Sequence, residues 1–141
     1  MKLQRWLKER LKTEVRNHGR ILEIGCDDGQ MVIQFSKIFK NFKEFVGIDK
    51  ALEKKCYNPK VRLLKADILN LPFKKSSFSI LLSSRVFHYL RFEDKKKALN
   101  ECWRVLSKGG SFYMIECFLK DNYPVGGVID INIDNSDNYM T

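Results

Sequence analysis

The segment Arg20–Gly29 constrains the fold of this chain more than any other part of the sequence. It begins with a short apolar run, Arg20–Ile24, which holds one acidic residue and breaks into a turn with glycines at positions 25 and 29. A helical pattern follows from Gln30 to about Lys40. This order predicts a strand, a tight loop and a helix N-terminus, the arrangement with which α/β sheets bind nucleotide-like cofactors.

The length and composition predict one globular domain. The 141 residues are 44% hydrophobic and 12% aromatic, which is enough to build a buried core. No apolar run approaches the roughly 18 residues that a transmembrane helix needs. The basic start, Met1–Leu11, is not followed by the apolar stretch of a signal peptide. We expect a single domain over 1–141, with an N-terminal amphipathic helix (1–18), a core (19–117) and an acidic tail (118–141).

The cysteines indicate a reducing compartment. They are Cys26, Cys56, Cys102 and Cys117. None forms a Cys-x-x-Cys spacing, and each lies in or beside a predicted element, so we expect buried thiols rather than disulfides or zinc ligands. The sequence therefore predicts a cytoplasmic protein without a metal site.

The charge is large and unevenly placed. Lys and Arg number 26 against 17 Asp and Glu, for a net charge of +9, yet residues 121–141 contain four aspartates and no Lys or Arg. A basic body favours an anionic partner such as RNA, DNA or an acidic protein. A solvated lysine-rich surface explains the same composition. The sequence shows neither an interleaving of arginine with aromatic residues nor a recognisable nucleic-acid-binding motif that would decide between the two.

The rest of the chain alternates apolar runs with helical patterns. Strands are expected at 44–48, 61–65, 78–83 and 111–117, and helices at 3–15, 51–57 and 93–106. This alternation predicts a parallel sheet with right-handed crossovers. The continuous apolar run Phe78–Ser83 predicts a central strand that is buried on both faces. Alternating residues in Val128–Ile133 predict one more strand, half exposed or at an edge.

Acidic residues in or at the ends of the predicted strands are the candidate ligand-binding groups. Glu23 could organise a cationic group, and Gly25 and Gly29 let the backbone approach a ligand closely. Asp49 follows the next strand and could accept two hydrogen bonds from a ribose diol. Asp67 could meet an adenine amino group, or it could cap a turn.

Taken in order, these segments resemble the class I S-adenosylmethionine-dependent methyltransferases, in particular the small-molecule-type subgroup with a Leu-Pro-Phe loop. The motifs that carry the resemblance are Ile21–Gly29, Phe45–Lys50, Ala66–Ile68, Leu71–Phe73 with Ser77–Ser79, Ser83–Leu90 and Leu99–Gly110. The resemblance implies an α/β, Rossmann-like three-layer sandwich. Its mainly parallel sheet would have the order 3-2-1-4-5 plus a possible C-terminal strand, in a minimal or truncated methyltransferase fold.

The resemblance also implies a cofactor, S-adenosyl-L-methionine, and transfer of its methyl group to an unidentified acceptor by in-line displacement. The residues implied at the methionine end of the cofactor are Glu23, Gly25, Cys26 and Gly29. Those implied at the ribose and adenine are Asp49, Lys50, Asp67 and Ile68. Ser84 and Arg85 would border the methyl group. His88 could act as a general base, or it could be structural or line the pocket.

Two departures from the family pattern leave other functions open. Asp27 stands where the family has a glycine; it could crowd the cofactor and repel its carboxylate, or hydrogen-bond its ammonium group. Only one plausible strand follows Cys117, and its apolar edge could pair with a second copy, with another protein or with its own sheet. The alternative is therefore a non-catalytic methyltransferase-like subunit that binds or stabilises a partner. The first loop alone would also permit a nicotinamide-dependent oxidoreductase, although the Leu-Pro-Phe loop and Asp67 argue against it.

Overall fold

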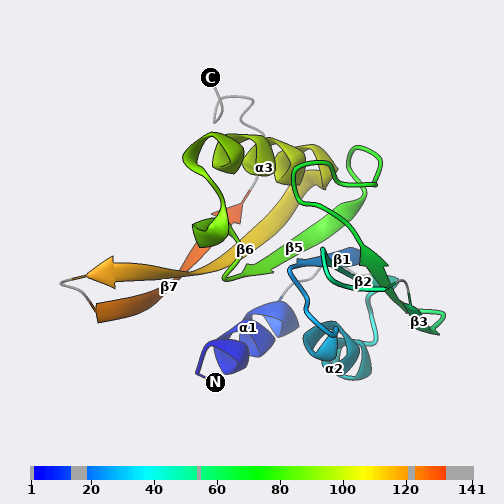
Figure 1. Cartoon of the computed structure of the whole chain (residues 1–141). Coiled ribbons are helices and arrows are strands. Elements are labelled where there is room, and N and C mark those ends of the chain that lie inside the picture. The colour runs from blue at the N-terminus through cyan, green and yellow to red at the C-terminus, as the bar shows by residue number, and fades with distance from the viewer. Residues whose placement is uncertain (1, 14–18, 54, 121–122, 133–141) are drawn as a thin grey trace.

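A computed structural model describes residues 2–13, 19–53, 55–120 and 123–132 of the chain. It shows a seven-stranded sheet with helices on both faces (Figure 1). The elements are α1 (Lys2–Thr13), β1 (Arg20–Ile24), α2 (Gln30–Ile38), β2 (Glu44–Asp49), β3 (Lys55–Asn58), β4 (Val61–Lys65), β5 (Phe78–Ser84), the 3-10 helix η1 (Phe87–Tyr89), α3 (Phe92–Val105), β6 (Leu106–Lys120) and β7 (Tyr123–Asn132). No described helix is both long and apolar enough to cross a bilayer.

The strand order confirms the predicted topology. The sheet runs β3-β4-β2-β1-β5-β6-β7. Its five inner strands, from β4 to β6, are parallel, and in the numbering of the predicted strands they have the order 3-2-1-4-5. The two edge strands are antiparallel, with β3 against β4 and β7 against β6. All carboxyl ends of the parallel strands therefore meet at one edge, where a doubly wound sheet binds its ligands.

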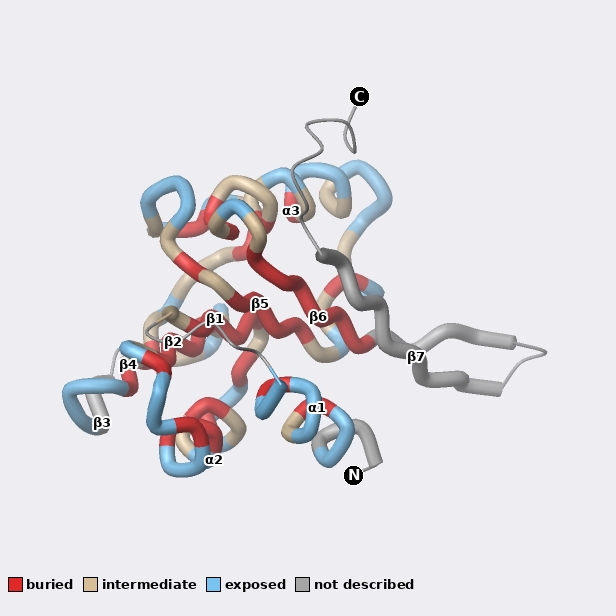
Figure 2. Tube along the Cα trace, turned by 180° about the vertical axis from the view of Figure 1, so that it is seen from behind, coloured by how far each residue is buried: buried red, intermediate tan, exposed pale blue. Residues whose placement is uncertain are grey.

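The two faces of the sheet carry separate apolar clusters, which makes the three-layer sandwich. Helices α1 and α2 cover one face, and α3 and η1 cover the other (Figures 1 and 2). Because strand residues alternate between faces, Ile21 packs with Leu7 and Phe35 under α1 and α2, whereas Leu22 packs with Cys102 under α3. The prediction that β5 is buried on both faces is confirmed by its residues from Ile80 to Ser83.

One predicted helix is wrong. The segment Ala51–Tyr57 does not form a helix, and its second half belongs to β3, which makes a hairpin with β4. Asn58 closes the turn of this hairpin, since its Oδ1 accepts a hydrogen bond of 2.8 Å from the backbone N–H of Lys60. Asn58-Pro59 leads into the β-turn of the hairpin, and the seven-residue helical pattern before it is too short to outweigh strand pairing.

Smaller differences concern the helix ends and the tail. Helix α2 ends at Ile38, two residues before the end that its pattern indicates; Ile38 is exposed, and Phe39 after it is buried. Strand β6 begins at Leu106 and not at the expected residue 111, and its register with β5 shifts between the pairs made by Phe78 and Ile80. The predicted tail strand is confirmed in part: β7 begins earlier, at Tyr123, and folds back onto its own sheet, and Ile133 lies outside the described residues.

A row of charged side chains ties the first halves of three strands together. Glu44 on β2 accepts a hydrogen bond of 2.7 Å from Nε of Arg20 on β1, and its other oxygen accepts one from Nε of Arg62 on β4. The Arg20 guanidinium also lies 5.0 Å from the centre of the Phe78 ring on β5. Burial alone would raise the pKa of Glu44, but the two arginines outweigh it and hold that pKa below its usual range.

We predict that Glu44→Gln lowers the free energy of unfolding at neutral pH by about 1–3 kcal/mol, because it leaves two arginines with weakened partners. The folded-state pKa of Glu44 lies below the unfolded one, so this stabilisation is present at neutral pH and is lost as the pH falls through the folded-state pKa. Urea denaturation measures the effect. The matched control is Glu9→Gln, which breaks an exposed ion pair with Lys12 and should change stability by less than about 0.5 kcal/mol. Equal effects of the two variants would contradict the prediction.

Candidate functional site

The loop after β1 is held against the end of β2 by backbone hydrogen bonds. The N–H groups of Gly25 and Cys26 both donate to the carbonyl oxygen of Ile48 at 2.9 Å, and Gly29 N–H closes the loop on Cys26 O at 2.8 Å. Gly25 has a φ of +73°, and a Cβ added to it would lie 2.3 Å from Cγ2 of Val86. Glycine is therefore required here both by the left-handed backbone and by the close approach of the segment that follows β5.

Asp27 adopts the conformation that a glycine would take with less strain. Its φ is +51°, in the left-handed region, and its side chain is exposed. Asp is among the few residues that tolerate this region. Its backbone N–H donates to Oδ2 of Asp49 at 3.0 Å, which fixes the loop. Asp27, which stands where the family has a glycine, thus adds backbone strain and a negative charge to the loop, and its backbone N–H ties the loop to Asp49.

Asp49 joins the loops that follow β1 and β2. Besides the bond from Asp27, its Oδ1 accepts a 3.0 Å hydrogen bond from the backbone N–H of Ala51. Each carboxylate oxygen has two acceptor sites, so both can accept a further hydrogen bond from a ligand. The assignment of Asp49 to a ribose diol stays a prediction, and its part in organising the two loops is visible in the structure.

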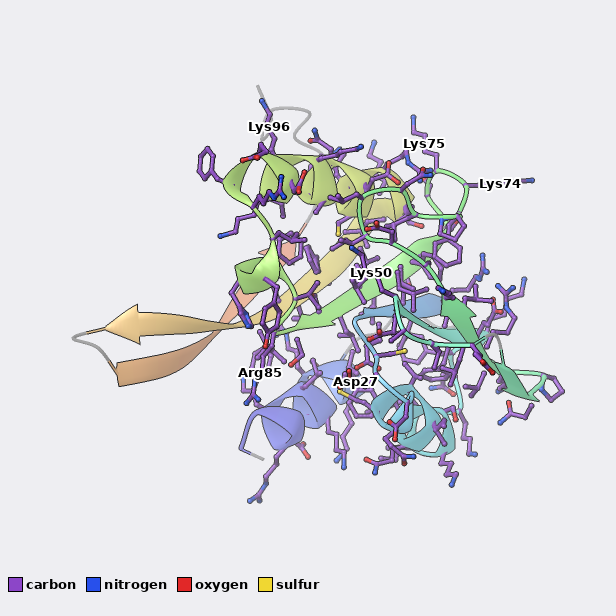
Figure 3. The ribbon with its side chains drawn as sticks, viewed as in Figure 1. Asp27, Lys50, Lys74, Lys75, Arg85 and Lys96 are labelled. Carbon is purple, nitrogen blue, oxygen red and sulfur yellow. The ribbon has the colours of Figure 1, made fainter. Side chains whose placement is uncertain are left out.

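Lys50 and Asp67 pair across the ends of β2 and β4. Lys50 Nζ lies 3.5 Å from Asp67 Oδ2, and both side chains are exposed. The other oxygen of Asp67 accepts a hydrogen bond of 3.0 Å from the backbone N–H of Leu69, so Asp67 caps the turn, one of the two alternatives that the sequence left open. Ile68, which lies between Asp67 and Leu69 in the chain, is buried in the core under α3. Figure 3 shows Asp27 and Lys50, which come from the neighbouring loops after β1 and β2.

Glu23 is a buried carboxyl at the base of the candidate site. It is 5% exposed, and its Oε2 has no hydrogen-bond partner. Burial, followed by the charge of Asp27, raises its pKa to about 8, and Asp28 and Asp49 add to the shift. At neutral pH this carboxyl is therefore mostly protonated. A buried polar atom without a partner is rare in folded proteins, and at a predicted binding loop it marks a place where a cationic group would be accepted.

Cys26 lies within the same cluster. Its thiol is buried, and this burial, with the charges of Glu23 and Asp49, raises the pKa to about 12. The thiol is therefore neutral at physiological pH and has none of the thiolate character of a nucleophilic cysteine. Within the described parts of the chain, no three His, Cys, Asp or Glu residues are grouped as a metal site.

The residues expected beside the methyl group lie at the end of β5 and just after it. Ser84 is half-buried, and Arg85 is exposed with a φ of +57°, its N–H bonded to Ile115 O at 2.7 Å. Val86, which the sequence did not single out, brings this segment against Gly25. His88 is exposed, and its ring centre lies 4.1 Å from that of Tyr89, so the structure places it on the surface of η1 and not within the carboxylate cluster.

Sequence reasoning also missed how the Leu-Pro-Phe loop is held. Arg104 on α3 donates to the carbonyl oxygens of Phe73 at 2.6 Å and Leu71 at 2.9 Å, and to the carboxylate of Glu101. Glu101 in turn accepts a 2.7 Å hydrogen bond from the N–H of Leu71. Both residues belong to the motif Leu99–Gly110. Only their spacing of three residues on one helix could have indicated that they act together to hold the loop.

A cavity of about 460 Å³ lies away from the glycine loop. It opens between β4, the start of β1 and the loop before β5. Its lining residues are Arg20, Arg62, Leu64, Lys65, Pro72, Phe73, Lys74 and Ser77. None of the residues proposed from the sequence lines it, so we base the candidate site on the loops at the carboxyl ends of β1, β2, β4 and β5.

We predict that Glu23→Gln stabilises the protein in a pH-dependent way. From about pH 4.5 to about pH 8, folded Glu23 keeps a proton that the unfolded chain has lost, so its contribution to stability falls as the pH rises through this window. Glutamine is neutral and removes this penalty. Since one pKa unit corresponds to about 1.4 kcal/mol and the pKa rises from 4.5 to about 8, we expect a gain of up to roughly 5 kcal/mol above pH 8 that shrinks towards pH 5. Urea denaturation at both ends of this range measures it, with exposed Glu53→Gln as the control; a gain independent of pH would contradict the prediction.

A second prediction concerns the left-handed backbone at Asp27. Asp27→Gly should be at least as stable as the original chain, whereas Asp27→Ala should be about 1 kcal/mol less stable than the glycine variant, because a Cβ in the left-handed region costs energy. Thermal or urea unfolding of the two variants compares them directly. If the alanine variant were the more stable one, the left-handed conformation of residue 27 would be wrong.

Comparison with known proteins agrees with this geometry. A family model described as a methyltransferase domain matches residues 22–114. An uncharacterized protein of Haemophilus influenzae is 32% identical over 111 residues, which are 73% of this chain and 44% of that protein. The ubiquinone/menaquinone biosynthesis C-methyltransferase UbiE of Azotobacter vinelandii is 28% identical over 127 residues, 82% of this chain and 49% of the relative.

The solved structures show the same fold. The YcgJ protein of Bacillus subtilis superimposes with a TM-score of 0.67 at 24% identity, over 86% of this chain and 53% of that chain. The chain spans about half the length of the curated relatives it matches. Since the family model covers all the strands that carry the candidate site, the chain belongs to the methyltransferase-domain family.

Proposed function

We propose that this chain forms the cofactor-binding domain of an S-adenosylmethionine-dependent methyltransferase. The observation that carries the proposal is the buried carboxyl of Glu23, whose Oε2 has no hydrogen-bond partner, with Asp27, Asp28 and Asp49 close enough to raise its pKa. A group that brings positive charge into this cluster would relieve the repulsion. The methionine end of the cofactor carries an ammonium, a carboxylate and a sulfonium group and is positive overall, so the residues present fit its cationic groups.

The same cluster disfavours a dinucleotide cofactor. A pyrophosphate would have to sit at the start of α2, where the exposed carboxylates of Asp27 and Asp28 lie. Asp28 already accepts a hydrogen bond of 3.3 Å from the N–H of Gln30, the first residue of that helix. Helix N-termini attract phosphate through such N–H groups, and a carboxylate in that place competes with it.

Each candidate residue takes a role in this proposal. S-adenosylmethionine supplies a methyl group already activated on sulfur, so the protein's part is to bind, orient and exclude water. Glu23, with Gly25, Cys26 and Gly29, would hold the methionine end; Asp49 would hold the ribose hydroxyls; Lys50, Asp67 and Ile68 would hold the adenine; and Ser84 and Arg85 would border the methyl group. His88 is close along the chain to these last two, and as a neutral imidazole it could accept a proton from the acceptor.

The proposal extends to the organisation of the protein. We treat residues 1–141 as one methyltransferase domain in the cytoplasm; the buried free thiols Cys26 and Cys102 are compatible with a reducing compartment. The relatives named above include a C-methyltransferase, but the acceptor of this chain is left open. A non-catalytic subunit is the second candidate, because Asp27 brings a carboxylate and a left-handed backbone into the glycine loop and Val86 packs closely on Gly25.

Calorimetric titration with S-adenosylmethionine and S-adenosylhomocysteine tests the proposal. We expect micromolar binding of both, weakened by about tenfold or more in Asp49→Asn, since a hydrogen bond to a charged group contributes roughly 1.5–3 kcal/mol. The matched control is Glu53→Gln, an exposed carboxylate a few residues later, which should bind normally. Circular dichroism checks that each variant is folded. Absence of binding to the folded original chain would reject the enzyme and favour the non-catalytic subunit.

A further inference from the structure

Two large aromatic side chains stand out on the surface. Tyr89 is 81% exposed and Phe92 is 88% exposed, whereas the other exposed large apolar residues that the structure describes, Trp6 and Ile38, are only 40% and 45% exposed. Both rings belong to the segment Arg85–Phe92, which follows β5. Single exposed apolar residues are common on protein surfaces, but here two strongly exposed rings lie three residues apart in one segment.

Two arginines lie in the same segment as these rings. Arg85 and Arg91 are exposed, and neither forms an ion pair with any residue that the structure describes. Lys96 on α3 is also exposed and points away from the sheet, but it lies far from Arg85, which is placed near α1 (Figure 3). The acidic residues nearest in the chain, Glu93 and Asp94, lie in the first turn of α3, which they stabilise.

The segment buries its apolar residues and exposes its polar and aromatic ones. Val86, Phe87 and Leu90 pack against the core under α3. The residues left exposed are Arg85, His88, Tyr89, Arg91 and Phe92, so one arginine, Arg91, lies between the two rings along the chain. The sequence alone does not show this because it does not tell which side chains of the segment are buried.

The patch is held in place beside the candidate cofactor loop. Val86 packs on Gly25, and Arg85 N–H is bonded to Ile115 O at 2.7 Å. Helix η1 fixes the next residues through hydrogen bonds from Tyr89 N–H to Val86 O at 3.2 Å and from Leu90 N–H to Phe87 O at 3.0 Å. A molecule lying on Tyr89 would therefore lie next to the loop to which the proposed function assigns the cofactor.

We infer that Arg85–Phe92 is the acceptor-docking surface and that its ligand is single-stranded nucleic acid. Unpaired bases would stack on Tyr89 and Phe92, and phosphates would pair with Arg85 and Arg91, the combination by which proteins bind single strands. Small molecules are bound in concave pockets, whereas rings this exposed lie on open surface and suit a polymer. The net charge of +9 adds attraction for a polyanion. That the nucleic acid is the methyl acceptor rests on the proposed function, whereas binding of nucleic acid to this surface does not depend on it.

Fluorescence anisotropy of the full chain with labelled oligouridine RNA and oligothymidine DNA of about 12 nucleotides, in the absence of cofactor, tests the inference. We expect Tyr89→Ala/Phe92→Ala to weaken binding by about tenfold or more, as loss of base stacking does. Arg91→Gln should weaken it and reduce the slope of log affinity against log salt by about 1. Comparison of the RNA and the DNA shows which sugar is preferred, and a preference for either one supports the proposed binding surface.

Matched controls lie on α2, which covers the opposite face of the sheet (Figure 1). Ile38→Ala removes an exposed apolar side chain and Lys37→Gln removes an exposed cation, and both should change affinity by less than about twofold. Absence of oligonucleotide binding would overturn the inference. So would binding that survives Tyr89→Ala/Phe92→Ala but is lost in Lys65→Gln/Lys74→Gln, because the nucleic acid would then occupy the basic cavity.

The calorimetric titration with cofactor is kept separate from this assay. Oligonucleotide binding without cofactor binding would leave the surface standing and reject the enzyme. Cofactor binding without oligonucleotide binding would leave the enzyme standing and reject this acceptor class. Polyphosphate that binds as tightly as the oligonucleotides, and equally well to Tyr89→Ala/Phe92→Ala, would show that the surface attracts phosphate by charge alone. That result would overturn the inference.

Discussion

The candidate site depends on one junction, where the loop after β1 meets the end of β2. Ile48 O receives two backbone N–H groups from that loop, and the carboxylate of Asp49 receives a third, from Asp27. These bonds fix where the loop turns, and therefore where α2 begins and which groups surround Glu23. Because β1 lies between β2 and β5, the same junction also sets how Val86 meets the loop from the other side.

The parallel core of the fold could be predicted from the sequence because its strands are short, mostly apolar segments that alternate with helical patterns. Arg20–Ile24 and Val61–Lys65 have the bounds that their patterns indicate, although only Val61 and Leu63 are fully buried in the second strand. The β3 hairpin could not be predicted in the same way. Its strand exists because Lys55–Asn58 pairs with β4, and a four-residue segment carries too little periodicity to show this pairing.

The candidate site was predictable in its location but less so in its chemistry. The order of strands places Gly25, Asp49 and Asp67 at one edge of the sheet, as the sequence indicated. The partners of those residues depend on backbone geometry that no spacing reveals: Asp67 caps its own turn. The exposed rings were missed for a related reason, because the sequence does not tell that Phe87 is buried while Tyr89, two residues later, is 81% exposed.

The distribution of charge connects the two proposals. The chain is strongly basic overall, yet its glycine loop gathers four carboxyl groups, and one of them, Glu23, is buried deeply enough to keep its proton near neutral pH. Protonation of Glu23 lowers the mutual repulsion of the carboxyl groups around the loop. A cationic cofactor would let Glu23 ionise, and the acidic loop would repel the phosphates of a polyanion. Acidic groups at the loop would thus attract a cationic cofactor, and cations on the segment after β5 would attract an anionic acceptor. The two ligands would then lie in adjacent places, as methyl transfer from one to the other requires.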